Sequence, residues 1–181
     1  YTRVSMNLRG KCLVARPEIK DSLFKKSVVF IYENAKQGTA GLILNKPNRS
    51  TNTRELCMHR GYDVNVPQET VYVGGPVNSR ATVMLHSADW EASNTMLINN
   101  QISISSDDLM LYRYTQGDTP RYYRFYTGLS VWHPQQIIAE TNRNHWLVTD
   151  IDCETIFETD ARHLWDIAVE QAAQSTMDKF I

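Results

Sequence analysis

Six short runs of β-branched, aliphatic and aromatic residues occur within the first 126 residues of this 181-residue chain. Runs of this length and composition are typical of β-strands. The first two are almost entirely apolar, which suits strands that are buried on both faces. We therefore predict strands at Val28–Tyr32, Gly41–Leu44, Val71–Val73, Thr82–Leu85, Ile102–Ile104 and Tyr122–Tyr126.

Three helix starts carry capping residues. Asn52 or Thr53 precedes a segment that ends near Gly61, and glycine is favoured just after a helix. The Ser-Ser-Asp-Asp run at 105–108 places hydroxyl groups and negative charge at a second helix start. Pro134 occupies the favoured first position of a third helix.

A fourth helix near the C-terminus has the clearest pattern. Leu164, Ala168 and Ala172 recur every four residues, and Trp165 and Val169 widen the apolar stripe that they form. Strands and helices mix along the chain without strict βαβ alternation, which favours the α+β class over a doubly wound sheet. No repeat, linker or change in charge divides the sequence, so we expect one domain over residues 1–181.

The overall charge and the cysteines exclude several classes of protein. The formal charge of −1 and the pI near 6.6 give no general basic surplus for binding nucleic acid. No apolar run approaches the roughly 20 residues of a membrane-spanning helix, so we expect no membrane association. Cys12, Cys57 and Cys153 are scattered and odd in number, which predicts reduced thiols in a cytoplasmic protein.

Standard catalytic and metal-binding motifs are missing from the sequence. It contains no GxGxxG, P-loop, HExxH or GxSxG pattern, and its five histidines lack metal-ligand spacing. The glycine turn at 38–41 lacks the lysine that would contact phosphates. Catalytic groups can still converge from distant positions, so an enzyme stays open at this point.

Two local groups could perform acid–base or nucleophilic chemistry. His86 and Ser87, with Asp89 nearby, suggest a base and a nucleophile, but adjacent side chains on a strand point to opposite faces. We therefore favour a strand end that runs into a polar loop. Asp107 and Asp108 could act as acid and base, but their place at a helix start favours capping.

Two further segments could bind ions. Asp150, Asp152 and Glu154 alternate and could hold a hard cation on one side of an extended chain. They lack the glycine of a calcium loop, and we favour a solvated acidic connection before the last helix. Gly74 and Gly75 follow a strand and could form an anion-binding nest, although we favour a purely structural turn.

Arginines are interleaved with aromatic residues at 121–126 in a pattern that permits two interpretations. A single-strand nucleic-acid platform formed with Arg113 would expose at least two arginines and two tyrosines on one surface. A core strand would bury one face and leave at most one arginine free. We favour the core strand, with Arg113, Arg121 and Arg124 as the nucleic-acid candidates.

The order of several short motifs resembles the YqgE/AlgH family over nearly the whole chain. Each piece is weak alone, whereas the ordered set is specific. His133 and Gln135 depart from it, because they replace two family glycines. The matching segments are Asn7–Gly10, Leu13–Pro17, Phe24 with Ser27–Val29, Gly41–Pro47, Val73–Val77, Leu85–His86, Ser103–Leu109, Trp132–Gln136, Glu140, Asn144, Trp146–Leu147, Asp152, Ile156–Phe157, Trp165 and Ala168.

This resemblance implies a bent, barrel-like mixed β-sheet flanked by helices, with no established enzymatic activity and no cofactor. Some members carry the label of transcriptional regulator. We therefore expect a non-enzymatic binding or regulatory protein for an unidentified protein or small-molecule ligand. The alternatives are an enzyme with a cleft site and a weak nucleic-acid-binding regulator. The candidate binding residues are the polar positions and glycines that match the family, namely Asn45, Lys46, Gly74, Gly75, His86, Asp107 and Glu140.

Overall fold

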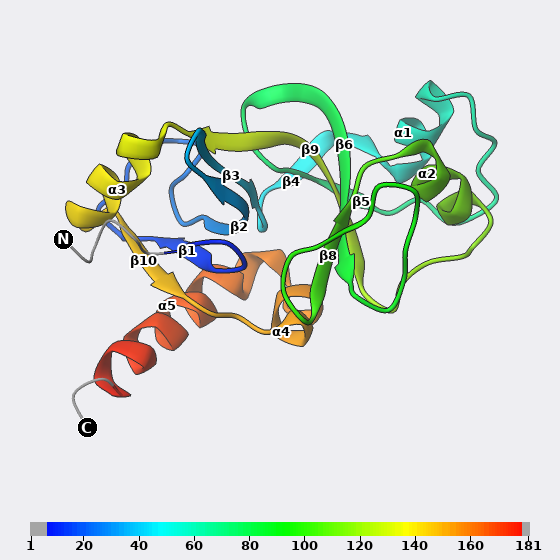
Figure 1. Cartoon of the computed structure of the whole chain (residues 1–181). Helices are drawn as coiled ribbons and strands as arrows, with labels where there is room; N and C mark the ends of the chain where they lie inside the picture. Colours follow the sequence, from blue (N-terminus) through cyan, green and yellow to red (C-terminus); the bar gives the residue numbers. More distant parts are fainter. Residues whose placement is uncertain (1–6, 179–181) are drawn as a thin grey trace.

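Residues 7–178 are described in the computed structural model, where they form ten strands and five helices (Figure 1). The helices are α1 (Thr53–His59), α2 (Asp108–Thr115), α3 (Pro134–Asn142), α4 (Cys153–Glu158) and α5 (Ala161–Asp178). The strands are β1 (Cys12–Ala15), β2 (Val28–Ala35), β3 (Gly38–Ile43), β4 (Pro47–Asn52), β5 (Thr70–Val73), β6 (Val77–Ser87), β7 (Met96–Leu97), β8 (Ile102–Ser105), β9 (Tyr123–Trp132) and β10 (Trp146–Thr149).

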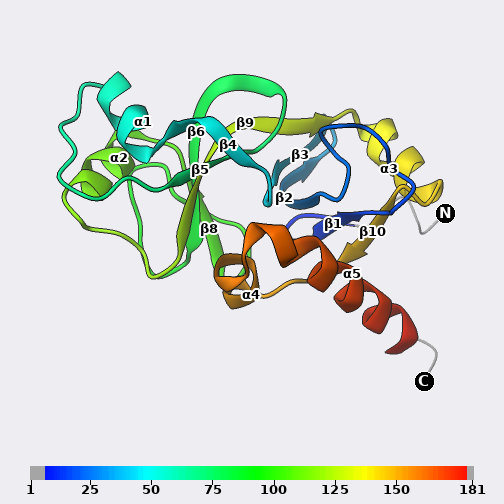
Figure 2. The same ribbon diagram turned by 180° about the vertical axis from the view of Figure 1, so that it is seen from behind.

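The strands form one mixed sheet whose main path runs β10-β1-β2-β3-β9-β6-β8-β7. Neighbours along this path are antiparallel, whereas β5 pairs in parallel with β9 and carries β4 on its other side. The sheet curls into a half-barrel with the helices around it, so the predicted α+β class and bent, barrel-like sheet are confirmed (Figures 1 and 2).

β9 joins the two halves of this sheet, and it turns at Gly128. Its first half pairs with β5 and β6, and its last residues pair with β3. Gly128 lies between these segments with a φ of 75°, in the left-handed region that favours glycine. The turn allows one strand to serve both halves of the half-barrel.

The largest core cluster lies where α4 and α5 pack against the sheet. Leu164 and Ala168 are fully buried, and Ala172 is nearly so, which confirms the predicted apolar stripe of the last helix. Leu164 and Ala168 belong to the same cluster as Val14 of β1 and Phe30 of β2. Figure 1 shows α5 along the lower side of the sheet, with α1 and α2 together at one end and α3 at the other.

Each predicted strand overlaps an observed one, although the observed strands are longer at one or both ends. Asn52 caps α1 by accepting the Glu55 N–H, and Gly61 follows the C-cap with a φ of 83°, both as predicted. The serines at 105 and 106 do not cap α2, because the carboxylate of Asp107 does so.

The connection at 150–154 carries exposed acidic side chains between β10 and the C-terminal helices, as in the solvated connection that we favoured. It is not extended throughout, because Asp152 accepts the Thr155 N–H and starts α4 at Cys153. Asp150 instead pairs with Lys11 at 2.9 Å. Within residues 7–178, no three His, Cys, Asp or Glu side chains gather where they could hold a metal ion.

Candidate functional site

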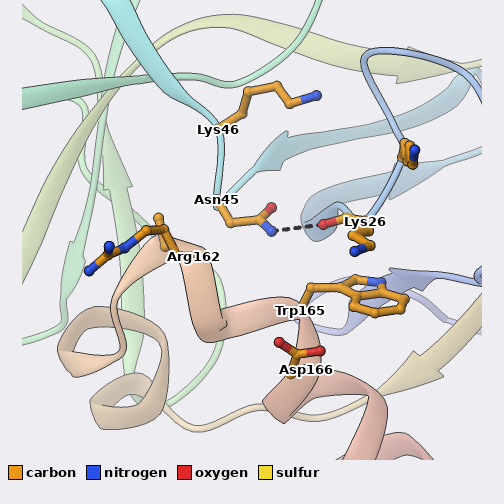
Figure 3. A pocket seen from close by; sticks show the side chains of 8 residues that line it. Lys26, Asn45, Lys46, Arg162, Trp165 and Asp166 are labelled. Atoms are coloured by element: carbon orange, nitrogen blue, oxygen red, sulfur yellow. Dashed lines mark hydrogen bonds between the residues drawn. The ribbon is translucent and has the colours of Figure 1, made fainter.

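A pocket of about 250 Å³ lies between the end of β3 and the beginning of α5 (Figure 3). We call it the lysine pocket, because three of its lining residues are lysines. One wall comes from the turn before β2, one from the β3–β4 junction, and one from the first turns of α5. The lining residues are Lys25, Lys26, Asn45, Lys46, Ala161, Arg162, Trp165 and Asp166.

Asn45 builds the wall of the lysine pocket through hydrogen bonds to the backbone. Its Nδ2 donates to the carbonyl of Lys26 at 2.9 Å, and its Oδ1 accepts the N–H of Val28 at 3.0 Å. Lys26 has a φ of 53°, which is unfavourable for a residue with a side chain. Asn45 therefore stabilises the turn that carries Lys25 and Lys26, and its amide is committed to that task.

Lys46 lines the lysine pocket, and its ammonium group is hydrogen-bonded to the 22–23 turn. Its Nζ donates to the carbonyls of Ser22 and Leu23, at 2.9 and 2.6 Å. Partial burial lowers the pKa of Lys46, and the nearby Asp21 carboxylate opposes that shift. Lys46 therefore contributes positive charge to the pocket, while its ammonium group holds the 22–23 turn in place.

Trp165 and two lysines supply the groups that are free to meet a ligand. The Trp165 indole Nε1 donates to the carbonyl of Ala15 at 2.8 Å, which fixes the ring on β1. The Lys26 ammonium lies 5.7 Å from the Trp165 ring centroid. Within residues 7–178, neither Lys25 nor Lys26 makes a side-chain hydrogen bond or ion pair.

The acidic groups near the lysine pocket offset only part of this charge. Asp160 pairs with Arg162 at 3.1 Å, and this contact lowers the pKa of Asp160 to about 2. Asp166 is the single carboxylate in the lining. Arg162 is thus already paired, and three lysines share the lining with one carboxylate, which gives the pocket a positive field.

A larger groove adjoins the lysine pocket at Ala161 and Arg162, which line both. It has a volume of about 790 Å³ and lies between β4, β5 and the α4–α5 connection. We call it the polar groove, because its surface is mostly hydroxyl, amide and charged groups. Lys46 and Pro47 are consecutive, so one chain segment passes from the pocket into the groove.

Both the sequence and the fold of this chain are similar to those of known proteins. Residues 12–176 match the family model described as AlgH-like. This chain belongs to the AlgH-like family. A UPF0301 protein of Marinomonas sp. is 33% identical over 156 residues, covering 84% of this chain and 82% of the relative. A UPF0301 protein of Photobacterium profundum is 30% identical over 170 residues, covering 91% of each chain.

Two solved structures have similar folds. The solution structure of the AlgH protein from Pseudomonas aeruginosa superposes with a TM-score of 0.79 at 24% identity, covering 92% of this chain and 89% of that one. The crystal structure of protein DIP2367 from Corynebacterium diphtheriae gives 0.69 at 20% identity, covering 89% and 85%. These comparisons establish the AlgH-like fold of the chain. In the part of the chain described, no helix is long and apolar enough to cross a membrane.

In this AlgH-like protein, His86 lies in the core and away from the lysine pocket. Its Nδ1 lies 2.8 Å from the carbonyl of Ser87, which can only accept, so Nδ1 carries the proton. Its Nε2 therefore accepts from the hydroxyl of Ser105 at 2.7 Å. The hydroxyl of Ser87 donates instead to Asp89, so the side chains of His86 and Ser87 are not hydrogen-bonded to each other, as the strand alternation predicted.

The hydroxyl of Ser105 was not recognised from the sequence as a partner of His86, because it lies in a run that resembles a helix cap. It accepts from the hydroxyl of Thr95 at 2.7 Å, which in turn accepts the N–H of Ala92 at 2.6 Å. His86 and Ser105 are both buried. This chain of hydrogen bonds satisfies buried polar groups and joins β6, β8 and the 92–95 loop.

Asp107 and Glu140 also lie outside the lysine pocket. Asp107 accepts the N–H groups of Met110 and Asn94, both at 2.8 Å. Glu140 on α3 accepts from the Trp146 indole at 2.9 Å. Of the five polar residues that match the family, the structure brings together only Asn45 and Lys46, so this set forms no shared cleft.

The glycines at 74 and 75 provide close contact between strands. The N–H of Gly74 donates to Thr127 at 2.8 Å, and its carbonyl accepts from Ile43 at 2.9 Å. A side chain at Gly75 would collide with the backbone of Leu129. Both glycines are buried against β9, which is the arrangement of a structural turn.

The three candidate nucleic-acid arginines do not share a surface platform. Arg124 donates to the carbonyls of Ile156, Phe157 and Thr159 at 3.0–3.3 Å, and it lies over the Tyr72 ring. Arg113 contacts the Glu91 carbonyl and the Trp90 ring. Of these three arginines, Arg121 alone is exposed. A core strand, which leaves at most one arginine free, has this pattern.

Several lining residues of the lysine pocket were missed from the sequence, among them Lys25, Lys26 and Arg162. The adjacent lysines do have a sequence signal, because they directly precede the Ser27–Val29 motif of the resemblance. Arg162 has none, since it comes within reach of the lysines only when α5 packs against β1 and β2.

Proposed function

We propose that this AlgH-like protein is a binding protein that holds an anionic ligand in the lysine pocket. The observation that carries this proposal is the excess of three lysines over one carboxylate in that lining, where Arg162 is already paired with Asp160. Lys25 and Lys26 make no side-chain hydrogen bond or ion pair among the described residues, and Lys26 lies over the Trp165 ring, so both can bind a ligand without breaking a hydrogen bond. An oxyanion such as phosphate is attracted by this field and by charge-assisted hydrogen bonds.

The composition of the lining favours binding over catalysis. It consists of lysine, arginine, asparagine, alanine, tryptophan and aspartate, without a serine, cysteine or histidine that could act as a nucleophile or base. The Asn45 amide is already used by the backbone of Lys26 and Val28. These features support a site that holds a charged group without transforming it.

The proposal is tested by titrating the protein with inorganic phosphate and with pyrophosphate. Trp165 is half-buried, whereas Trp90, Trp132 and Trp146 are at most 9% exposed, so Trp165 is the natural fluorescent reporter. We expect a saturable change in Trp165 fluorescence with either ligand. Pyrophosphate should bind more tightly than phosphate because it carries more charge, and raised salt should weaken the binding of both. Calorimetry on the same samples gives the Kd independently of fluorescence.

Lys26→Gln is the diagnostic variant, because it removes the charge of a side chain that makes no hydrogen bond or ion pair within residues 7–178. Its matched control is Lys36→Gln, an exposed lysine of the β2–β3 turn outside the pocket. We expect Lys26→Gln to weaken pyrophosphate binding by about three- to tenfold and Lys36→Gln to leave it unchanged. Absence of binding at low salt, or equal effects of the two variants, would overturn the proposal.

A further inference from the structure

The polar groove is large and lies next to the lysine pocket. Its volume of about 790 Å³ is roughly three times that of the pocket, at about 250 Å³. Ala161 and Arg162 line both spaces. A ligand with its anionic group in the lysine pocket therefore has space for a second chemical group in the adjoining polar groove.

The lining of the polar groove indicates what this second part is. Small-molecule sites commonly measure about 300–1,000 Å³ but are mainly apolar, whereas this surface presents threonine, asparagine, glutamine, arginine and carboxylate groups. Such a surface matches many hydroxyl groups better than a hydrocarbon chain. The basic residues Arg49, Arg124 and Arg162 are balanced by Glu69, Glu158 and Asp160, so the second part is uncharged.

Several polar groups of the groove are committed to the fold. Arg124 donates to three carbonyls near the end of α4, and Arg162 pairs with Asp160. One oxygen of Glu69, Oε1, accepts from the hydroxyls of Tyr114 and Tyr123, at 2.8 and 2.6 Å. These contacts hold the walls of the groove rigidly.

Other polar groups of the groove are free. The exposed side chains of Arg49 and Gln68 make no hydrogen bond or ion pair within residues 7–178. The Oε2 atom of Glu69 likewise accepts no hydrogen bond within that range. β4 is bulged here, because no residue of β5 stands opposite residues 49–51. The groove thus offers donors and acceptors that a ring with several hydroxyls can satisfy.

We infer that the ligand of this site is a phosphorylated sugar, with its phosphate in the lysine pocket and its hydroxylated ring in the polar groove. The inference rests on the proposed function, because the lysine pocket supplies the anchor. Simple sugar phosphates and nucleotides share this chemistry, and the groove is large enough for either. Arg49 and Gln68 donate to ring hydroxyls, and Glu69 accepts from them.

The test compares four probes by calorimetry on the full chain: inorganic phosphate, ribose, ribose 5-phosphate and AMP. We expect ribose 5-phosphate to bind at least about tenfold more tightly than phosphate, which corresponds to one or two added hydrogen bonds. Ribose alone should bind too weakly to measure. A further gain with AMP identifies nucleotides as the source of the sugar phosphate, and equal affinity identifies simple sugar phosphates.

Two sets of variants separate the two parts of the site. Arg49→Ala with Gln68→Ala removes free groups only, so the protein should fold normally, which a melting curve checks. This double variant should lower the affinity for ribose 5-phosphate to that for phosphate and leave phosphate binding intact. Lys26→Gln should lower the affinities for phosphate and for ribose 5-phosphate by a similar factor.

The outcomes distinguish failure of this inference from failure of the proposed function. If phosphate binds but neither ribose 5-phosphate nor AMP binds more tightly, the sugar phosphate inference is wrong and the anion pocket stands. The same conclusion follows if the double variant leaves ribose 5-phosphate binding unchanged. If none of the probes and no pyrophosphate binds, both proposals are wrong.

Discussion

The side-chain amide of Asn45 holds the backbone on both sides of Ser27, donating to the Lys26 carbonyl at 2.9 Å and accepting the Val28 N–H at 3.0 Å. Lys26 itself has a φ of 53°. The amide of Asn45, which the motif suggested as a ligand contact, is thus used in hydrogen bonds to the backbone. The cations that it positions come from the turn before β2, which is distant in sequence from Asn45.

Asn45→Ala should lower the free energy of unfolding by about 1–3 kcal/mol, because the N–H of Val28 is then left without its acceptor next to the core. Urea denaturation monitored by circular dichroism measures this difference. Asn100→Ala is the control, since that exposed side chain makes no hydrogen bond within residues 7–178, and it should change stability by less than about 0.5 kcal/mol. Equal stabilities of the two variants would contradict the role given to Asn45.

Lys26→Gly separates the stability of the turn from the charge of the lysine pocket. Glycine adopts a φ of 53° without the cost of roughly 1–2 kcal/mol that a side chain brings, so the variant should be at least as stable as the parent. Binding of pyrophosphate should nevertheless weaken as much as in Lys26→Gln. Urea denaturation and calorimetry measure the two effects, and intact binding in Lys26→Gly would show that the ammonium is not a ligand contact.

His86 should make the stability of the protein depend on pH. Burial lowers its pKa below the ordinary value of 6.5, while the Ser87 carbonyl and Asp89 oppose that shift. The unfolded chain therefore binds the proton more readily than the folded one. The stabilisation is complete above about pH 6.5 and is lost as the pH falls from there through the pKa of the folded state.

Urea denaturation between about pH 7.5 and pH 5 tests this dependence. His86→Gln keeps a hydrogen-bonding side chain without an ionisable ring, and it should flatten the fall in stability over that range. His59→Gln, at an exposed position at the end of α1, should retain the fall seen in the parent. An unchanged slope in His86→Gln would assign the effect to other groups.

Arg124→Lys should loosen the connection between α4 and α5. The arginine guanidinium donates to three carbonyls at once, from Ile156, Phe157 and Thr159, and an ammonium group cannot reproduce that planar arrangement. We expect a loss of about 1–3 kcal/mol and faster hydrogen exchange in residues 153–160. Arg121→Lys is the control, because the exposed Arg121 side chain lies over the Tyr122 ring and makes no hydrogen bond or ion pair within residues 7–178. Exchange rates that rise equally in both variants would contradict this anchoring role.

The elements that could be predicted are those whose local sequence determines their structure. The stripe of Leu164, Ala168 and Ala172 fixes the buried side of α5, and Asn52 marks the start of α1. β4 was not predicted, because its sequence Pro-Asn-Arg-Ser-Thr-Asn has no apolar alternation and is held by pairing with β5. Its extended form is a consequence of tertiary contacts.

The candidate site could be predicted only in part for a similar reason. Asn45 and Lys46 were identified through their motif and do line the lysine pocket. His86, Asp107 and Glu140 match the same family pattern, but each is committed to hydrogen bonds in another part of the fold. Polar residues that bind a ligand and polar residues that satisfy the backbone look alike in a sequence, and only the packing distinguishes them.

The glycine contact between β5 and β9 has a consequence for the tolerance of the chain to substitution. A methyl group at Gly74 would meet the Gly128 carbonyl and the side chain of Leu42, which leaves no room for it. The Gly74 carbonyl also accepts the Ile43 N–H, two residues before Asn45. Even an alanine at this point therefore displaces the segment that carries Asn45 and Lys46. The residues least able to vary therefore include glycines outside the lysine pocket, whereas Lys25 and Lys26, our proposed ligand contacts, are exposed and make no side-chain hydrogen bond within residues 7–178.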